Sequence, residues 1–495
     1  MKKEHSESHH VQFAIIGAGF GGLGMGIRLR LAGRQDFIIF ERASEIGGTW
    51  RDNTYPGCAC DIPSIVYSFS FDQNPEWSRL FPTQPEILAY LKQCVKRFQI
   101  EKQIQFNTDI QTLKFDEDEG VWHLKSRDGR EWTAQFVVSA MGPLNRPHIP
   151  NITGLDQFEG TQFHSSNWNH DHDLTGKRVA VIGTGASAIQ FVPQIAPQVQ
   201  QLSLFQRTPP WIVPRDDAPV SENRKRWLKN LPFLQSLLRG RRYWVLEAAV
   251  LNFLGNKTVA NYATSEALKH INNSISDPEL RRAVTPDYKF GCKRALVSDD
   301  YYPALERENV DLITSGIQEI RANSIIDQAG VERPIDTIIL GTGFVASEFL
   351  VDMKINGRKS QNGQPRELLT EWKDTGPEAY FGISTSGYPN LFFLLGPNTG
   401  LGHNSVILMM ESQYNYIMDY VRYLEKENKS FLDIDPTVQA EHNAEIQEKL
   451  KSTVWQTGGC TSWYQLGNGK NTTLWPGSTI GYRRITRKVH KEAYL

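Results

Sequence analysis

The sequence predicts an α/β fold in which two nucleotide-binding units are joined by a helical insertion. Residues 11–41 and 177–207 each follow the order apolar strand, glycine-rich turn, helical stretch, second strand. The helical stretches are predicted to run through Arg34 and through Ile195, and the second strand of the first unit is the apolar run 37–40. Residues 214–290 show helical periodicity with charged faces and no strand pattern. At about 100–200 residues per domain, a chain of 495 residues has room for two to four domains. Both units are therefore predicted to be Rossmann-like dinucleotide-binding domains.

The first unit begins with the apolar run at 11–16 and carries Gly17, Gly19 and Gly22 in the spacing G-x-G-x-x-G. The first glycine permits a tight turn, the second lets a pyrophosphate approach the backbone, and the third allows close helix–strand packing. Glu41 lies 24 positions after Gly17, and its carboxylate is expected to accept hydrogen bonds from ribose hydroxyls. This unit is predicted to hold an adenine dinucleotide with a free ribose.

The second unit repeats this arrangement in register. Ala188 takes the third glycine position, a tolerated variant, and Arg207 lies 24 positions after Gly183. A guanidinium at this point suits a 2′-phosphate, so the unit is predicted to prefer NADPH to NADH, with Thr208 adding a hydroxyl. The loop expected to hold the cofactor phosphates is Gly183, Thr184, Gly185, Ala186 and Ser187.

Two dinucleotide units in one chain indicate that electrons pass from a nicotinamide to a flavin. FAD in the first unit and NADPH in the second is the simplest assignment, which predicts a flavoprotein oxidoreductase. Dithiol chemistry is disfavoured because Cys58 and Cys60 are separated by a single residue, a poor geometry for a disulfide. The segment 47–71 is expected to wrap the isoalloxazine ring and to present the Asp61 carboxylate to it. Flavin contacts are expected from Thr49, Trp50, Asp61 and Tyr67.

The composition excludes several other classes of protein. The net charge is −1, which gives no support to nucleic-acid binding or a polybasic membrane anchor. Five scattered cysteines argue against a disulfide-stapled secreted scaffold, and no spacing predicts a metal site. The longest apolar stretch, 243–254, is too short to span a bilayer, and the N-terminus has no signal-peptide pattern. We expect a cytoplasmic protein without a membrane span, and a monomer, although the sequence itself carries no signal for the oligomeric state.

The segment between the two units carries a family fingerprint. Phe158, Gly160, His164 and Trp168 fit the pattern F-x-G-x-x-x-H-x-x-x-W, with Asn169 where Pro or Asp is usual. The chain thereby resembles the Baeyer–Villiger monooxygenases, flavoproteins that insert an oxygen atom beside a ketone carbonyl. In the related flavin-containing monooxygenases the tryptophan position is normally Phe or Tyr. The resemblance implies a structural or domain-rotation role for the histidine, not acid–base chemistry.

Two further segments resemble the family's catalytic loops. Residues 55–61 look like its active-site aspartate loop, and residues 291–294 look like its catalytic arginine segment. The resemblance places Lys293 at the NADPH phosphate and Arg294 at the flavin. It implies that a C4a-peroxyflavin attacks a ketone and that Arg294 stabilises the peroxide and the tetrahedral adduct. Asp61 would orient that guanidinium. The expected substrates are a small ketone and O2, and the products are esters or lactones, with sulfides as further substrates.

The resemblance extends to the end of the chain. Residues 337–344 resemble the strand that joins the family's domains, and residues 458–479 resemble its C-terminal segment over the active site. In that segment Trp463 takes a position that contacts the nicotinamide cofactor. Two alternatives remain open. One is a monooxygenase that oxidises nitrogen or sulfur, and the other is a flavin-binding NADPH oxidase or sensor that does not oxygenate a substrate.

The expected layout interleaves the domains. The helical insertion is expected to shape the substrate pocket, and its basic clusters at 224–226 and 239–242 are interpreted as solvated helix faces, with a peripheral membrane contact as the alternative. The predicted divisions are 11–144 (FAD-binding, first part), 150–213 (NADP-binding, first part), 214–290 (helical insertion), 291–348 (NADP-binding, second part) and 349–495 (FAD-binding, second part).

Overall fold

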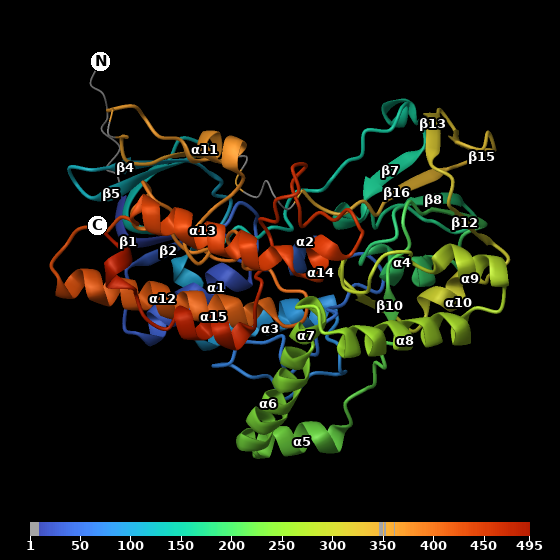
Figure 1. Ribbon diagram of the computed structural model, residues 1–495, viewed down its shortest axis with the longest axis horizontal. Coiled ribbons are helices and arrows are strands. Elements are labelled where there is room, and N and C mark those ends of the chain that lie inside the picture. The colour runs from blue at the N-terminus through green and yellow to red at the C-terminus, as the bar shows by residue number, and fades with distance from the viewer. Residues whose placement is uncertain (1–8, 346–349, 351–352, 361) are drawn as a thin grey trace.

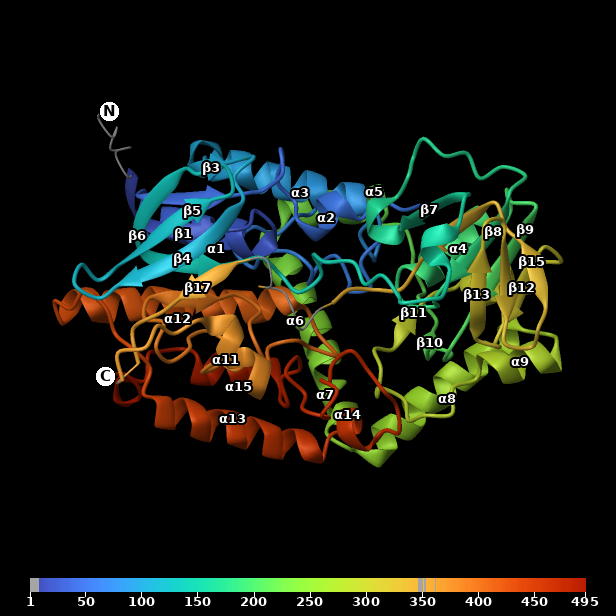
Figure 2. The same cartoon turned by 90° about the horizontal axis from the view of Figure 1, so that it is seen from above.

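Two α/β lobes lie side by side, each built around its own sheet, and a set of helices spans the space between them (Figure 1, Figure 2). The computed structural model describes residues 9–345, 350, 353–360 and 362–495. The predicted fold class, two Rossmann-like dinucleotide-binding domains with a helical insertion, is confirmed.

The first lobe contains an eight-stranded sheet in the order β17-β4-β5-β6-β1-β2-β3, with β18 also paired to β6. β1 lies between β2 and β6 and is parallel to both, with Ile15 opposite Ile39. A central parallel strand is covered on both faces, which is why the last four residues of β1, 13–16, are all apolar and buried. The strands are β1 His9–Ile16, β2 Phe37–Phe40, β3 Ile104–Gln105, β4 Ile110–Asp116, β5 Val121–Ser126, β6 Glu131–Ser139, β17 Lys354–Asn356 and β18 Leu391–Phe393.

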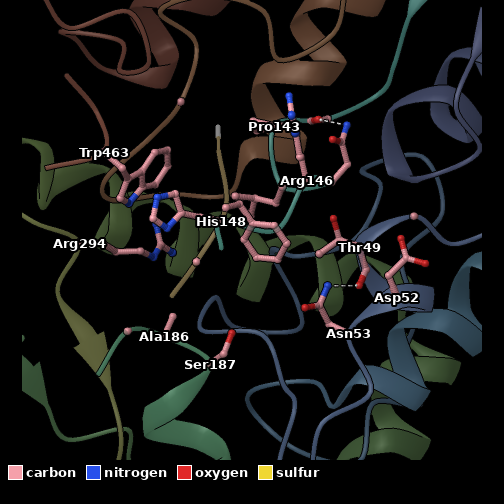
Figure 3. Close-up of a pocket in the computed structure, with 18 of the residues that line it drawn as sticks. Thr49, Asp52, Asn53, Pro143, Arg146, His148, Ala186, Ser187, Arg294 and Trp463 are labelled. Carbon is pink, nitrogen blue, oxygen red and sulfur yellow. Dashed lines mark hydrogen bonds between the residues drawn. The ribbon is translucent and has the colours of Figure 1, made fainter. Parts of the chain in front are cut away.

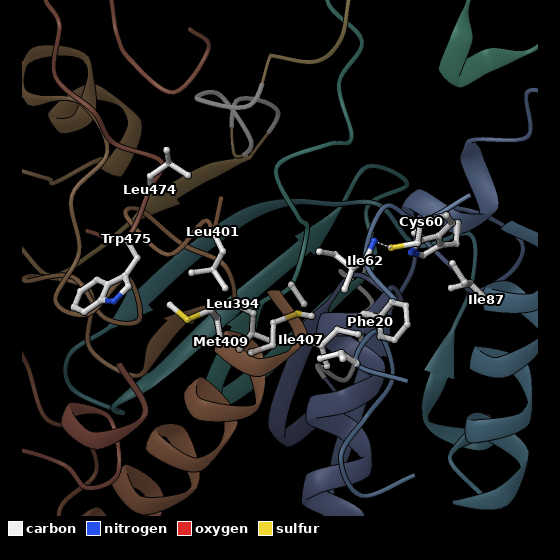
Figure 4. Packing of buried hydrophobic residues seen from close by; sticks show 14 of the residues in the cluster. Phe20, Cys60, Ile62, Ile87, Leu394, Leu401, Ile407, Met409, Leu474 and Trp475 are labelled. Carbon is white, nitrogen blue, oxygen red and sulfur yellow. Dashed lines mark hydrogen bonds between the residues drawn. The ribbon is translucent and has the colours of Figure 1, made fainter. Parts of the chain in front are cut away.

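Helices from both ends of the chain cover this sheet. α1 packs against α12, and Gly24 permits the contact because a Cβ there would lie 2.3 Å from the Tyr414 hydroxyl. Figure 4 shows the apolar core between these helices and the C-terminal loops, with Phe20 and Ile407 meeting across it. The helices are α1 Phe20–Leu31, α2 Thr49–Asp52, α3 Gln84–Arg97, α11 Leu368–Thr375, α12 Val406–Lys426, α13 Pro436–Lys451, α14 Val454–Thr457 and α15 Thr479–Ile485.

The second lobe contains a five-stranded, wholly parallel sheet in the order β12-β9-β8-β16-β7. A small antiparallel sheet of β13, β14 and β15 and the short pair β10–β11 lie beside it. Its elements are β7 Thr161–His164, β8 Arg178–Ile182, α4 Ala188–Ile195, β9 Gln201–Phe205, β10 Ile212–Val213, β11 Leu296–Val297, α10 Tyr301–Leu305, β12 Val310–Ile313, β13 Ile317–Arg321, β14 Ser324–Asp327, β15 Glu332–Pro334 and β16 Thr337–Leu340.

The insertion is helical, as expected. It consists of α5 Glu222–Asn230, α6 Pro232–Ala248, α7 Val250–Phe253, α8 Lys257–Ser274 and α9 Pro278–Val284. The interpretation of the basic cluster at 239–242 as a solvated face is wrong for Arg239, which is only 7% exposed. Within the described part of the chain, no helix combines the length and apolarity needed to cross a bilayer.

After the second lobe the chain returns to the first. β17 pairs with β4 and β18 with β6, so residues beyond 350 complete the eight-stranded sheet. The predicted boundary between residues 348 and 349 lies outside the described residues. The other predicted domain boundaries stay predictions.

Candidate active site

A cavity of about 1380 Å³ lies between the two lobes, where the two glycine loops face each other (Figure 3). Gly22 is the one predicted site residue that does not line it; the lining comprises Gly17, Gly19, Glu41, Thr49, Trp50, Asp61, Tyr67, Gly183, Thr184, Gly185, Ala186, Ser187, Arg207, Thr208, Lys293, Arg294 and Trp463. Residues far apart in the sequence therefore meet around one space.

The first glycine loop needs glycine for steric reasons. Gly17 has φ +105°, and a Cβ there would lie 2.7 Å from the Ala140 carbonyl oxygen. Its N–H donates to the Phe40 carbonyl at 2.8 Å, which fixes the turn at the end of β1. A Cβ on Gly22 would lie 1.8 Å from the Gly17 carbonyl oxygen, so α1 is packed tightly against the loop. Such a bare, open turn before a helix N-terminus fits a pyrophosphate.

Glu41 holds this loop together. Its side chain is buried, and one carboxylate oxygen accepts a hydrogen bond from the Ala18 N–H at 3.0 Å. The other oxygen accepts from the Ala43 N–H at 3.0 Å and pairs with Arg51 Nη1 at 2.9 Å. The sequence did not single out Arg51, although its position beside the GGTW segment places it in the same loop as Thr49.

Trp50 and Tyr67, both in the segment 47–71 that is expected to wrap the isoalloxazine ring, contact each other. The Trp50 indole N–H donates to the Tyr67 hydroxyl at 3.1 Å, and the two rings meet edge to face with centroids 5.7 Å apart. Thr49 opens α2 and accepts through its carbonyl from the Asn53 side chain at 2.9 Å. This small cluster gives the cavity a rigid aromatic wall on the side of the first lobe.

The second glycine loop has the same geometry. Gly183 has φ +106°, its N–H donates to the Phe205 carbonyl at 3.0 Å, and a Cβ there would lie 2.4 Å from the Gly341 carbonyl oxygen. The Thr184 hydroxyl donates to the Thr208 carbonyl at 3.4 Å, which joins the loop to the end of β9. Two loops of one design thus face the same cavity.

Two cations gather at the second loop. Burial lowers the pKa of the Lys293 ammonium, and the nearby Arg207 charge lowers it further. The Lys293 Nζ lies 5.2 Å from the centre of the Tyr288 ring, which holds the ammonium in a cation–π contact. Like charges held close together repel each other unless an anion lies between them, so the pair fits a phosphate group.

Asp61 and Arg294 form a two-pronged ion pair at the cavity wall. Arg294 Nε donates to Asp61 Oδ2 at 2.7 Å and Nη2 to Oδ1 at 2.8 Å, while Nη1 reaches the Leu401 carbonyl at 3.4 Å. Burial opposes ionisation of Asp61, but the Arg294 charge and the hydrogen bonds to the carboxylate together outweigh it, so the pKa of this carboxyl lies below its ordinary value. The Asp61 charge raises the pKa of Arg294. Both groups are therefore charged at neutral pH, and about a quarter of each side chain faces the cavity.

The nearby thiols are not arranged for redox chemistry. Cys58 and Cys60 are both free and buried. Burial raises the pKa of Cys58 to about 11 and that of Cys60 well above its ordinary value, so neither forms a thiolate at neutral pH. The arrangement agrees with the sequence-based argument against dithiol chemistry.

Hydrogen bonds of Gln190, a residue that the sequence did not single out, link the two lobes near the aspartate loop. The Gln190 side chain, on α4, accepts from the Tyr55 hydroxyl at 3.1 Å and the Ala59 N–H at 3.3 Å. Its amide donates to the Ala59 carbonyl at 3.0 Å. The aspartate loop of the first lobe is thus hydrogen-bonded to the helix that follows the second glycine loop.

The C-terminal segment closes the cavity beside Arg294. Trp463 is half exposed and contacts Tyr464, with the ring centroids 4.5 Å apart and the ring planes tilted by 53°, and Figure 3 shows it on the same side of the cavity as Arg294. Burial raises the pKa of Tyr464 to about 12. A disulfide joins Cys292, two residues before Arg294, to Cys460 in this segment. The sparse, scattered cysteines did not predict this cross-link.

His164 lies outside the cavity. It ends β7, is buried, and its Nδ1 accepts from the Ser166 N–H at 3.1 Å, capping a short 3-10 turn. Burial lowers its pKa. Its position suits a structural part in the connection between the lobes, in line with the reading that it is no acid or base.

Comparisons with known proteins agree with this architecture. Residues 10–362 match the flavin-binding monooxygenase-like family. The chain is 50% identical over 488 residues to a Baeyer–Villiger monooxygenase of Pseudomonas aeruginosa, covering 98% of this chain and 92% of that protein. It is 45% identical to a Baeyer–Villiger monooxygenase of Streptomyces coelicolor, covering 99% and 94%.

Solved structures show the same fold. An oxidised steroid monooxygenase bound to NADP is 30% identical, with a TM-score of 0.85 and 99% of each chain covered. The closed form of cyclohexanone monooxygenase is 27% identical, with a TM-score of 0.85 and again 99% of each chain covered. A structure of OTEMO in complex with FAD and NADP is 26% identical, with a TM-score of 0.86, covering 99% of this chain and 100% of that one.

Fold and site together define an NADPH-dependent flavoprotein monooxygenase with one dinucleotide-binding unit in each lobe. The chain belongs to the flavin-binding monooxygenase-like family, and the resemblance to Baeyer–Villiger monooxygenases is confirmed. The predicted cofactors, FAD and NADPH, are confirmed with it.

Proposed function

We propose that this enzyme carries out a Baeyer–Villiger oxidation: a ketone, O2, NADPH and a proton give an ester or lactone, water and NADP⁺. The observation that carries the proposal is the charged Asp61–Arg294 pair at the cavity wall between the two glycine loops. FAD and NADPH, when bound, supply the two electrons and the activation of O2. The relatives of highest identity described above carry the name of this reaction.

The residues of the cavity fit both cofactors. The Gly17 turn leaves room for a pyrophosphate at the N-terminus of α1, and Glu41 lies at the ribose position beside it. The paired cations Arg207 and Lys293 fit a 2′-phosphate at the second loop. We assign the first loop to FAD and the second to NADPH.

Arg294 provides a fixed positive charge where an oxyanion develops on the substrate carbonyl. Because Asp61 holds the guanidinium through two hydrogen bonds, the charge needs little reorganisation during the reaction. Asp61 contributes as the partner that orients Arg294. Trp463, from the C-terminal segment, covers this side of the cavity and limits the access of water.

The test is product analysis with the purified enzyme, NADPH, ¹⁸O2 and a panel of linear, cyclic and aryl ketones. We expect one labelled oxygen atom in an ester or lactone. Arg294→Ala should keep flavin reduction by NADPH but lose the ester, while Arg321→Ala, an exposed arginine on β13, should behave like the unaltered enzyme. Unchanged oxygenation in Arg294→Ala would remove this residue from the mechanism.

Sulfides belong in the same panel, because monooxygenases of this kind can oxidise sulfur as well as insert oxygen beside a carbonyl. We propose that they are oxidised to sulfoxides as a secondary activity. Sulfoxides without an ester from any ketone would assign the enzyme to heteroatom oxygenation. Hydrogen peroxide equal to all NADPH consumed, with every substrate tried, would assign it to NADPH oxidation alone.

A further inference from the structure

Helix α6 of the insertion has the reverse polarity of an ordinary surface helix. Its buried side carries the polar residues Gln235, Arg239 and Glu247. Its solvent side carries Phe233 and Leu237, which are 69% and 65% exposed. Surface helices of water-soluble proteins normally bury the apolar stripe and expose the charges.

Hydrogen bonds from buried polar side chains attach the inner side of α6 to the protein, in addition to the packing of Leu246 against the core. Arg239 donates to the carbonyls of Ile65 at 2.6 Å and Ser68 at 3.0 Å. Glu247 accepts from the Asn404 side chain at 2.9 Å and the Thr479 hydroxyl at 2.7 Å. Burial of Glu247 opposes its ionisation, but hydrogen bonds outweigh this and lower its pKa to about 2. The orientation of α6 is therefore fixed, and its apolar side is held toward solvent.

The outward residues form a continuous row. Phe233, Leu237 and Trp244 are spaced by four and seven positions, which places them on one line along the helix. The row continues on α5 and at the turn between the helices. We call this surface the outer face, and it consists of Trp227, Leu231, Phe233, Leu237, Trp244 and Val245, each at least 42% exposed.

The outer face is bordered by positive charge. Apart from Arg239, which is buried on the inner side, residues 221–245 contain six Lys and Arg and one Glu, a net charge of +5 in a chain whose total is −1. Burial lowers the pKa of Arg242, and the charges of Arg224 and Arg241 lower it further, so these three guanidinium groups lie near one another. Within the described part of the chain, none of the three has a carboxylate at ion-pair distance. Arg241 lies four positions from both Leu237 and Val245, on the same side of α6.

We propose that the outer face docks on an anionic lipid surface. Trp, Phe and Leu beside a cluster of Arg and Lys are typical of helices that lie in the interface of a bilayer, with the apolar side chains among the headgroups. Aromatic side chains favour this zone, and basic residues are attracted to the phosphates. Figure 1 shows α5 and the adjoining end of α6 standing below the rest of the protein, so a flat surface can reach them.

The charge argues against a second copy of the chain as the partner. A symmetric contact through the outer face would bring Arg224, Arg241 and Arg242 of one copy against the same residues of the other. Such a juxtaposition of like charges is unfavourable. An anionic surface would instead neutralise these positive charges and at the same time cover the apolar row.

The experiment is co-sedimentation of the full-length holoenzyme with vesicles. One set contains phosphatidylcholine with about one quarter phosphatidylglycerol, and the other contains phosphatidylcholine alone. We expect binding to the anionic set that weakens as salt rises from ~0.05 M to ~0.5 M. Phe233→Ser/Trp244→Ser and Arg224→Glu/Arg241→Glu should each bind at least about tenfold more weakly.

Matched controls separate the outer face from general effects. Leu31→Ser/Val331→Ser removes exposed apolar side chains elsewhere, and Lys373→Glu/Lys488→Glu reverses exposed charges elsewhere. Both should bind like the unaltered enzyme. Absence of binding to anionic vesicles at low salt, or equal loss in the controls, would overturn the proposal. So would a dimer in light scattering that Phe233→Ser/Trp244→Ser dissociates, because the outer face would then belong to a second copy.

Discussion

The two glycine loops have almost the same backbone, yet they end in opposite charges. Gly17 and Gly183 have φ values of +105° and +106°, and each donates its N–H to the last residue of the following strand. At the end of that strand the first unit carries Glu41, which is buried and bonded to its own loop. The second carries Arg207, which is exposed and lies near Lys293.

This comparison separates the features that any dinucleotide site needs from those that select one cofactor. Carbonyl groups surround Gly17 and Gly183 so closely that both turns demand glycine, whatever the cofactor. The residue at the end of the second strand differs between the units: Glu41 accepts a hydrogen bond from the Ala18 N–H of its own turn, whereas Arg207 is exposed near Lys293. We therefore expect the side chain at this position to set the preference of each unit for its dinucleotide.

The largest expected effect on stability and FAD binding comes from the third glycine position of the first unit, Gly22. Gly22→Ala would place a Cβ 1.8 Å from the Gly17 carbonyl oxygen, so α1 must move away from the loop. We expect a loss of about 3 kcal/mol in the free energy of unfolding, and FAD-free protein after purification. Thermal unfolding and the FAD-to-protein absorbance ratio measure these effects.

The matched change in the second unit is Ala188→Gly. It removes a methyl group from the first turn of α4 and should cost only about 0.5–1 kcal/mol, with FAD retained. If Gly22→Ala proved as mild as Ala188→Gly, the two helices would be packed alike, and the steric contrast between the units would be wrong.

Arg207→Ala tests the phosphate assignment of the second unit. We expect the KM for NADPH to rise about 10- to 100-fold, because a charge-assisted hydrogen bond is worth about 1.5–3 kcal/mol. The KM for NADH should hardly change, since NADH has no 2′-phosphate. Steady-state kinetics with both cofactors give the ratio, and Arg321→Ala serves as a control. An equal loss with both cofactors would contradict the assignment.

Glu41→Gln tests the first unit at the matching position. The amide oxygen replaces one carboxylate acceptor, so one of the hydrogen bonds to Ala18 and Ala43 is lost. We expect FAD to bind about fivefold more weakly, in line with about 1 kcal/mol for one hydrogen bond. FAD titration of the apoprotein measures this. Glu45→Gln, which alters an exposed pair with Lys92, should leave FAD binding unchanged.

The smallest expected effect is on the pH dependence of stability, and it comes from the Asp61–Arg294 ion pair. The pKa of Asp61 is lower in the folded protein than its ordinary 3.8, so its ionised form stabilises the fold above about pH 4. This contribution should be lost as the pH falls through the folded-state pKa. The difference in unfolding free energy between the unaltered protein and Asp61→Asn should shrink below pH 4. Chemical denaturation at several pH values measures it, and a constant difference would show that Asp61 does not titrate in this way.

Much of the fold could be predicted because its signals are local. The strand predicted at 37–40 is β2, Phe37–Phe40, and the helix predicted to reach Ile195 is α4, which ends there. The first helix was expected to run through Arg34 but ends at Leu31. Gly33 adopts φ +79° just beyond it and stops the helix, so only the boundary was wrong.

The contacts that assemble the cavity could not be predicted in the same way. Gln190 reaches Ala59 across 131 residues, and Arg294 reaches the Leu401 carbonyl across 107 residues. No local pattern distinguishes such a glutamine or carbonyl from any other. Family motifs placed Asp61 and Arg294 together, whereas chain geometry alone would have left them unrelated.

The disulfide between Cys292 and Cys460 restricts how the active site can open. It fastens the start of the closing segment to the polypeptide that carries Arg294, and the Lys289 N–H adds a hydrogen bond to the Gly458 carbonyl at 2.9 Å. While this cross-link is intact, Trp463 cannot move far from Arg294, because it lies only three positions after Cys460. The segment that covers Arg294 is therefore anchored to the same stretch of polypeptide that carries Arg294.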